Sequence, residues 1–276
     1  MFNSLTRYRW AKLLPFLRKA GLAPFAEYVL RRQIVRQSFN ANAELIAQNP
    51  GLPLPPAELL FETQGYGELA NYLATGKTAA QALWVQVTNV QPEVRHKPLR
   101  VLDWGCGVVR LTRHWPDIAP NWQLQCCDPN PTIGQWVRAN FPSLHFVPSK
   151  TQPPLPFEPE QFDLIYGVSI LTHIPIAQQS AWIQELTRIL RPNGLLALTL
   201  HSRTNIATLS TTERAKLARN GMVERAGAST GSRLFATYHD PDFVKKELSH
   251  GLTIMRYETL SAVASGGQDL WLLKKP

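Results

Sequence analysis

Short apolar runs alternate with longer amphipathic segments along the second half of the chain. Seven runs predict strands, at residues 100–103, 123–127, 144–147, 164–168, 195–201, 253–257 and 269–274. Helical spacing fills the intervals between the first five runs, which is typical of a parallel sheet. The last two runs are separated only by the short segment 259–267, which favours an antiparallel hairpin. We therefore expect an α/β fold with five parallel strands and a C-terminal antiparallel hairpin.

The first part of the chain is helical in pattern and strongly basic. Apolar residues recur at helical spacing over residues 5–47, with breaks at Gly21 and Pro24. Residues 1–36 hold eight lysines and arginines against the single acid Glu27. A stiff proline-rich stretch follows at 49–56. We expect a basic helical extension with its linker over 1–55 and the main domain over 56–276.

The basic extension leaves two interpretations open. The pattern favours a solvated basic helix packed on the main domain. The alternative is peripheral contact of its basic face with an anionic membrane. Residues 70–90 predict a further helix ahead of the first strand.

Composition narrows the function classes. The chain has 276 residues and a net charge of +9, which favours anionic partners. Its three cysteines form neither a disulfide framework nor a zinc-ligand pattern, so we expect a reducing compartment and no metal.

No apolar run approaches the ~18 residues that span a bilayer, and we predict no secretion signal. The expected location is cytoplasmic, with the inner membrane face as the alternative. The sequence lacks an interleaved basic and aromatic tract, so no nucleic-acid partner is expected.

The most informative motif follows the first predicted strand. Asp103 ends that strand, and Gly105 and Gly107 let the backbone turn tightly and approach a ligand, with Cys106 between them. An acid directly before the glycines disfavours a pyrophosphate and suits a cationic ligand. This residue argues against a dinucleotide-dependent oxidoreductase and for a nucleoside that bears a sulfonium or an amine.

The stretch resembles motif I of the class I S-adenosylmethionine-dependent methyltransferases, hydrophobic-Asp-x-Gly-x-Gly-x-Gly, with Val109 in place of the third glycine. The resemblance implies a Rossmann-like seven-stranded sheet with S-adenosylmethionine as the cofactor. It also includes a Pro-Leu-Pro-Phe segment before the fourth strand and an Arg-Pro-Asn-Gly turn at 191–194 before the fifth. The resemblance covers about residues 56–276.

Further cofactor-binding candidates stand at the carboxyl ends of two strands. Asp128 and Pro129 follow the second strand, where an acid can accept hydrogen bonds from both ribose hydroxyls. The alternative role of Asp128 is a helix N-cap. Ser169 and Thr172 follow the fourth strand. Residues 149–151 are candidates for the adenine side.

Three histidines are candidates for catalysis. Methyl transfer to a hydroxyl needs a group that removes a proton, and an unperturbed histidine titrates near neutrality. His173 follows the fourth strand, His201 ends the fifth, and His239 follows Tyr238 in a pair that the family often places near the substrate mouth. Each has a capping or core histidine as its alternative, and the sequence does not decide which one is the base.

These observations predict an S-adenosylmethionine-dependent methyltransferase that O-methylates a small molecule, sugar or glycan. The alternative is a catalytically inactive scaffold that binds the same cofactor, suggested by Val109. The sequence leaves the oligomeric state open.

Overall fold

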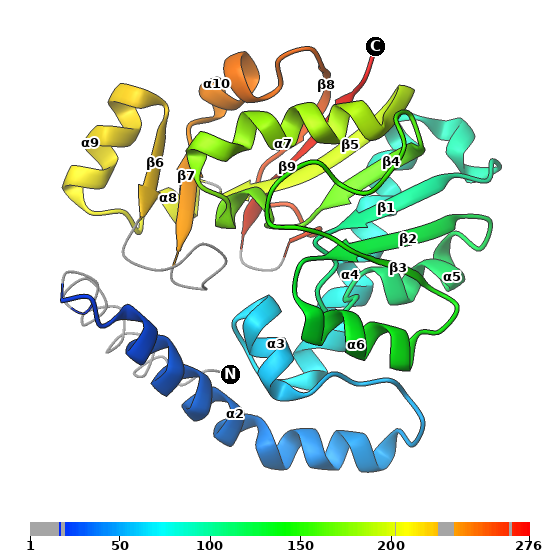
Figure 1. The fold of residues 1–276 in the computed structure, drawn as a ribbon, viewed down its shortest axis with the longest axis vertical. Coiled ribbons are helices and arrows are strands. Elements are labelled where there is room, and N and C mark those ends of the chain that lie inside the picture. Colours follow the sequence, from blue (N-terminus) through cyan, green and yellow to red (C-terminus); the bar gives the residue numbers. More distant parts are fainter. Residues whose placement is uncertain (1–16, 18–19, 202, 226–234, 265–266) are drawn as a thin grey trace.

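A computed structural model describes residues 17, 20–201, 203–225, 235–264 and 267–276 (Figure 1). Within these residues, the main sheet has seven strands in the order β3-β2-β1-β4-β5-β9-β8. The first five pair in parallel, and β9 and β8 pair antiparallel. The strands are β1 Arg100–Trp104, β2 Gln123–Asp128, β3 His145–Pro148, β4 Phe162–Gly167, β5 Leu190–His201, β8 Thr253–Glu258 and β9 Gln268–Lys274. The predicted Rossmann-like sheet is confirmed.

Helices cover both faces of this sheet (Figure 1). The α-helices are α2 Ala23–Gln48, α3 Ala57–Gln64, α4 Leu69–Val90, α5 Trp115–Ile118, α6 Pro131–Asn140, α7 Ile176–Ile189, α8 Arg203–Ile206, α9 Thr211–Asn220 and α10 Pro241–Phe243. The described residues also form the 3₁₀ helices η1 Pro92–Arg95, η2 Thr112–His114 and η3 Leu171–His173, and the π-helix η4 Val244–Leu248. None of the described helices combines the length and apolar character that crossing a bilayer requires.

Alternation along β4 explains the two layers of the core. Leu164 and Tyr166 point toward one face and pack in a cluster with Leu83 of α4. Ile165 points toward the other face and packs in a cluster with Leu186 of α7. Because successive side chains of a strand point to opposite faces, a strand buried on both sides reads as a continuous apolar run. This burial fixes the sheet between two helical layers and aligns the carboxyl ends of its parallel strands.

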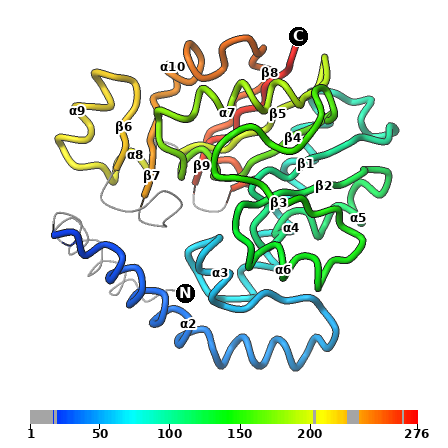
Figure 2. Tube along the Cα trace, viewed as in Figure 1, coloured from blue at the N-terminus to red at the C-terminus, as the bar shows by residue number. Residues whose placement is uncertain are grey.

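The long helix α2 lies along the outer side of α3, away from the sheet (Figure 2). Its residues Ile34, Ser38 and Asn42 are buried. The earlier part of the expected helix, residues 5–16 and 18–19, lies outside the described residues. The break predicted at Gly21 and Pro24 agrees with the start of α2 at Ala23.

Two local features differ from the pattern-based expectation. Between β5 and β8 the chain adds α9 and a two-stranded sheet of β6 Met222–Arg225 and β7 Ala236–His239. In the turn at 191–194, the positive φ of 65° falls on Asn193 rather than on Gly194. Asparagine tolerates the left-handed region better than most residues, so either Asn193 or Gly194 could adopt the positive φ.

Candidate functional site

Two adjoining cavities open at the carboxyl ends of the parallel strands. The first, of about 610 Å³, is lined by Asp128 and Pro129 after β2 and is called here the β2-side cavity. The second, of about 530 Å³, reaches His201 at the end of β5 and is called the β5-side cavity. The residues that line both are Thr63, Gln64, Gly105, Cys106, Val168, Ser169 and His173. A ligand in one cavity therefore meets a ligand in the other along this shared edge.

The glycine loop after β1 forms part of the shared edge. Gly105 and Gly107 have φ values of 73° and 50°, in the left-handed region that favours glycine. A Cβ on Gly105 would lie 2.4 Å from the Ile170 side chain, and one on Gly107 would lie 2.8 Å from Thr63. Both positions therefore exclude a side chain, as the motif predicts. The chain after the loop forms turns and the short η2 and α5, where the sequence suggested one helix.

Val109 occupies the third glycine position in the same backbone conformation. Its φ is 50° and its side chain is fully buried. A β-branched residue in the left-handed region is strained by about 1–2 kcal/mol. Packing with Leu60 and Val108 in the apolar cluster beneath the loop opposes that cost. The loop thus keeps its shape without the third glycine.

Asp128 connects the glycine loop to β2. Its Oδ2 accepts a hydrogen bond of 3.0 Å from the Gly107 amide, and its Oδ1 accepts one of 2.9 Å from the Asn130 amide. The helix α6 is capped instead by the Asn130 side chain, which accepts from the Thr132 amide. Burial raises the pKa of Asp128, and the two amide hydrogen bonds oppose this rise. The carboxylate orients the loop while lining the β2-side cavity.

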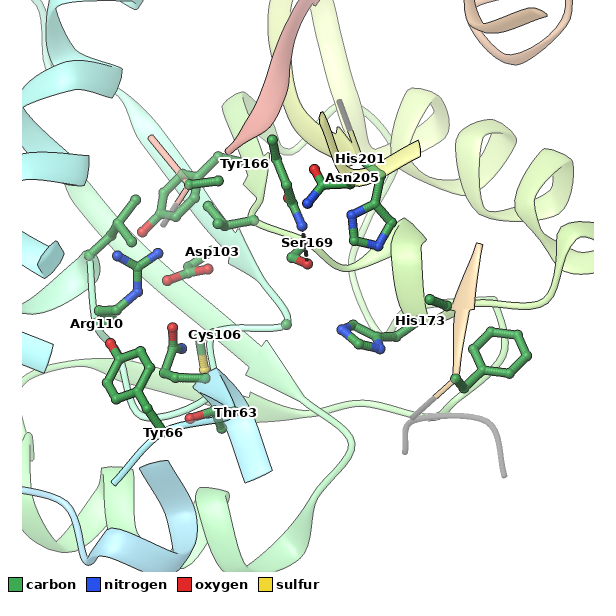
Figure 3. Close-up of a pocket in the computed structure, with 18 of the residues that line it drawn as sticks. Thr63, Tyr66, Asp103, Cys106, Arg110, Tyr166, Ser169, His173, His201 and Asn205 are labelled. Atoms are coloured by element: carbon green, nitrogen blue, oxygen red, sulfur yellow. Dashed lines mark hydrogen bonds between the residues drawn. The ribbon is translucent and has the colours of Figure 1, made fainter. Parts of the chain in front are cut away.

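Asp103 is buried at the wall of the β5-side cavity (Figure 3). It accepts a hydrogen bond from the Thr112 hydroxyl, which is also 2.9 Å from the Tyr166 hydroxyl. Burial raises the pKa of Asp103 to about 7, against the opposing effects of Thr112, Tyr166 and Arg110. A cation beside this carboxylate would favour its ionised form.

Arg110 lines the same cavity and was not among the predicted site residues. Its guanidinium Nη1 donates to the Thr75 carbonyl at 3.1 Å, and its Nε has no hydrogen-bond partner among the described residues. The residue is only 4% exposed, and burial lowers its pKa. A buried guanidinium that is not fully hydrogen-bonded suits an anionic group of a ligand. The signal in the sequence that could have identified Arg110 was its position three residues after Gly107.

Ser169 stands at the shared edge in a strained conformation. Its φ is 65°, and its amide donates to Thr199 Oγ1 at 2.8 Å. Its hydroxyl accepts a hydrogen bond of 2.7 Å from the Gln268 side-chain amide. Thr172 is fully buried beneath it, with its hydroxyl donating to the Ser169 carbonyl at 2.6 Å. Thr172 therefore holds Ser169 and lines neither cavity.

The structure brings two of the three candidate histidines to the cavities. His173 lines both, and His201 lines the β5-side cavity, where its ring stacks on Tyr238 with centroids 4.5 Å apart (Figure 3). His239 lines neither cavity and is 2% exposed. Its Nε2 lies 2.7 Å from Gln179 Oε1, and burial lowers its pKa to about 4.

The environment of His239 is that of a core residue. The Gln179 amide that faces it also donates to the Leu171 and Ile174 carbonyls, each at 3.0 Å, on either side of His173. His239 thus contacts Gln179, the side chain that is hydrogen-bonded to the backbone of η3.

The three candidates for the adenine side, Ser149, Lys150 and Thr151, line the β2-side cavity.

Part of the chain is similar to known proteins. Residues 101–194 match the family described as a methyltransferase domain. A malonyl-[acyl-carrier protein] O-methyltransferase from Enterobacter lignolyticus is 29% identical over 42% of this chain and 44% of its own length. An uncharacterized protein from Haemophilus influenzae is 45% identical over 15% of this chain and 17% of its own length. The chain thus spans less than half of the curated relatives that it matches.

Solved structures support the fold. The PH0226 protein from Pyrococcus horikoshii superposes with a TM-score of 0.52 at 15% identity, covering 71% of this chain and 89% of that one. A SAM-dependent methyltransferase from Methanosarcina mazei gives a TM-score of 0.50 at 16% identity, covering 65% and 93%. Residues 101–194 thus match a methyltransferase domain, and the fold around them is similar to that of these solved structures.

Proposed function

We propose that this chain is an S-adenosylmethionine-dependent methyltransferase that methylates a hydroxyl of a small molecule, sugar or glycan. The observation that carries the proposal is the meeting of two cavities along Gly105, Ser169 and His173. One cavity can hold the nucleoside of the cofactor, and the other can hold its amino-acid end together with the acceptor.

The residues present fit this cofactor. The carboxylate of Asp128 lines the β2-side cavity and can accept hydrogen bonds from ribose hydroxyls. Gly105 leaves a backbone cradle that a Cβ would close. In the β5-side cavity, Asp103 suits an ammonium group and Arg110, with its unpartnered Nε, suits a carboxylate. The negative charge of Asp103 and the positive charge of Arg110 together complement the ammonium and carboxylate groups of an amino acid.

When bound, S-adenosylmethionine supplies an electrophilic methyl group on a sulfonium sulfur. The protein's own contribution is to align the acceptor and to take its proton. His173 and His201 both line the β5-side cavity and are the candidates for the base. Two neutral groups on the same wall, Asn205 and Tyr238, can hydrogen-bond a polar acceptor.

The choice of oxygen as nucleophile has two supports. A hydroxyl must lose a proton on methylation, and His173 and His201 in the β5-side cavity can accept it. The relative from Enterobacter is named an O-methyltransferase. No observation on the described residues favours the inactive scaffold.

Calorimetric titration of the purified chain with S-adenosylmethionine and S-adenosylhomocysteine tests the cofactor. Binding of both ligands is expected, with a marked loss in Asp128→Ala and none in Asp117→Ala, a matched substitution at an exposed site. Absence of binding by folded protein would overturn the proposal. A screen of hydroxyl-bearing acceptors with methyl-labelled cofactor then tests the nucleophile, and label found only on nitrogen or carbon would contradict O-methylation.

A further inference from the structure

The helix α2 is held in one rotational setting by its buried face. Asn42 donates to the Gly67 carbonyl at 2.7 Å and accepts from the Leu69 amide at 2.9 Å. A Cβ on Gly67 would lie 2.7 Å from Ser38 Oγ and 3.1 Å from Ile34, so glycine lets the helix approach closely. The opposite face of α2 is therefore fixed toward solvent.

That opposite face is apolar and aromatic. Among the described residues, ten large apolar side chains are exposed, and five of them lie between Leu22 and Ile46. Phe25 and Phe39 are 64% and 68% exposed, and Tyr28 and Ile46 are more than half exposed. Phe25, Phe39 and Ile46 are separated by multiples of seven residues, so they lie on one side of the helix. This outer face is defined as Phe25, Tyr28, Arg32, Arg36, Phe39 and Ile46.

The charges on the outer face are all positive. Arg36 lies about 20° around the helix from Phe25, whereas the acids Glu27 and Glu44 lie about 160° and 100° away. Arg32 is held on the face by a hydrogen bond of 3.0 Å to the Tyr28 hydroxyl. Arg31, about 120° around the helix from Phe25, is instead paired with Glu62 at 3.1 Å. Exposed aromatic residues and uncompensated arginines thus share one side of a helix about 39 Å long.

We infer that the outer face of α2 docks on an anionic lipid surface. Aromatic and aliphatic side chains enter the boundary between headgroups and acyl chains, and arginines beside them attract anionic headgroups. A second copy of this chain fits less well, because self-association would bring arginines against arginines with no acid on the face. Glu27, on the inner side of α2, lines the β2-side cavity. Docking would therefore place α2 between the membrane and the β2-side cavity.

Sedimentation of the full chain with phospholipid vesicles tests this inference. The chain is expected to bind vesicles that contain phosphatidylglycerol and not vesicles of phosphatidylcholine alone. Replacing both arginines, Arg32→Gln with Arg36→Gln, should weaken binding by about thirtyfold. Phe25→Ser with Phe39→Ser should weaken it by about tenfold or more. The matched controls are Val85→Ser on α4 and Lys97→Gln before β1, both at exposed sites.

The outcomes separate the possible occupants. Equal binding to both vesicle types, or an equal loss in the controls, would overturn the inference. Conversion of a dimer to a monomer by the phenylalanine pair, seen by light scattering, would assign the face to a second copy instead. Salt dependence of vesicle binding by the unmodified chain gives a measurement that needs no variant, and it should show weaker binding at high salt. Vesicle binding is measured without the cofactor. A chain that does not bind vesicles would therefore overturn this inference without bearing on the proposed methyl transfer.

Discussion

The side-chain amide of Gln268, on β9, donates a hydrogen bond of 2.7 Å to the hydroxyl of Ser169, 99 residues earlier in the chain. The Oε1 of the same side chain accepts a hydrogen bond of 2.7 Å from Thr199, which in turn accepts from the Ser169 amide at 2.8 Å. Side chains from two strands of the sheet, β5 and β9, thereby hold Ser169 in the left-handed conformation at the edge shared by the two cavities.

Gln268→Glu removes the donor to Ser169 and keeps the acceptor for Thr199. We expect a lower kcat with little change in the KM for the cofactor, because the backbone at Ser169 loses one of its restraints. Gln268→Leu removes both hydrogen bonds and should also cost about 1–3 kcal/mol of unfolding free energy. Steady-state kinetics and urea unfolding check both variants, with the exposed Gln81→Leu as the control. Unchanged kcat in Gln268→Glu would contradict a positioning role.

Asp103 makes the stability of the protein depend on pH. Burial raises its pKa from 3.8 to about 7, so the folded protein keeps a proton that the unfolded chain has lost between about pH 4 and pH 7. Its contribution to the free energy of unfolding therefore falls as pH rises through that window. Asparagine cannot titrate, so Asp103→Asn should gain about 1 kcal/mol or more relative to the unmodified protein between pH 5 and pH 8. Urea unfolding at both pH values measures the free energies of unfolding of the variant and the unmodified protein. For the control Asp117→Asn, the difference between variant and unmodified protein should be the same at both pH values.

The same carboxylate should make cofactor affinity depend on pH. A cationic ligand beside Asp103 favours the ionised carboxylate, so affinity for S-adenosylmethionine should rise as pH passes upward through about 7. Asp103→Asn should bind more weakly at pH 8 and show little change with pH. Calorimetry at several pH values makes the comparison. An identical pH profile in the variant would place the cation elsewhere.

The histidine candidates can be told apart by kinetics. Loss of the base should lower kcat by about 10²–10⁴-fold while leaving cofactor binding intact. We expect this loss in His201→Asn or in His173→Asn, because both side chains line the β5-side cavity. His239→Asn should instead affect stability and retain the pH dependence of kcat, because His239 is buried against Gln179. A loss of pH dependence in His239→Asn alone would assign the base to a residue outside the cavities.

Val109 and Val108 offer a matched test of backbone strain. Both side chains are fully buried, but only Val109 has a positive φ among the two. At an ordinary position glycine is less stable than alanine by about 0.5–1 kcal/mol. Val108→Gly should therefore be less stable than Val108→Ala, whereas Val109→Gly should be at least as stable as Val109→Ala. Thermal unfolding of the four variants provides the comparison, and the same order at both sites would argue against strain at Val109.

The strands of the main sheet and the position of its ligand edge could be predicted from local sequence. Strands buried on both faces leave continuous apolar runs, and Gly105 and Gly107 mark the turn at which a side chain would clash. The small sheet of β6 and β7 was not predicted, because the four residues of each strand include charged or polar side chains and form no continuous apolar run.

The partners of the site residues depend on contacts that no local pattern contains. Ser169 and His239 both stand near the carboxyl end of a strand and carry polar side chains, yet one lines the cavities and the other is 2% exposed. The difference arises from Gln179 on α7, 60 residues before His239. The role of Gln268 likewise follows from the insertion of β9 beside β5, which places it near Ser169. Such placements are set by tertiary packing.

The position of β9 between β5 and β8 also bears on synthesis at the ribosome. A nascent chain that has emerged only as far as β8 can pair its five parallel strands, but β8 then has no neighbour, because β9 is its partner. The same nascent chain lacks the amide of Gln268, so Ser169 is held by fewer groups. Formation of the complete candidate site is therefore delayed until after translation of residues 268–274, whereas the glycine loop and Asp128 are available much earlier.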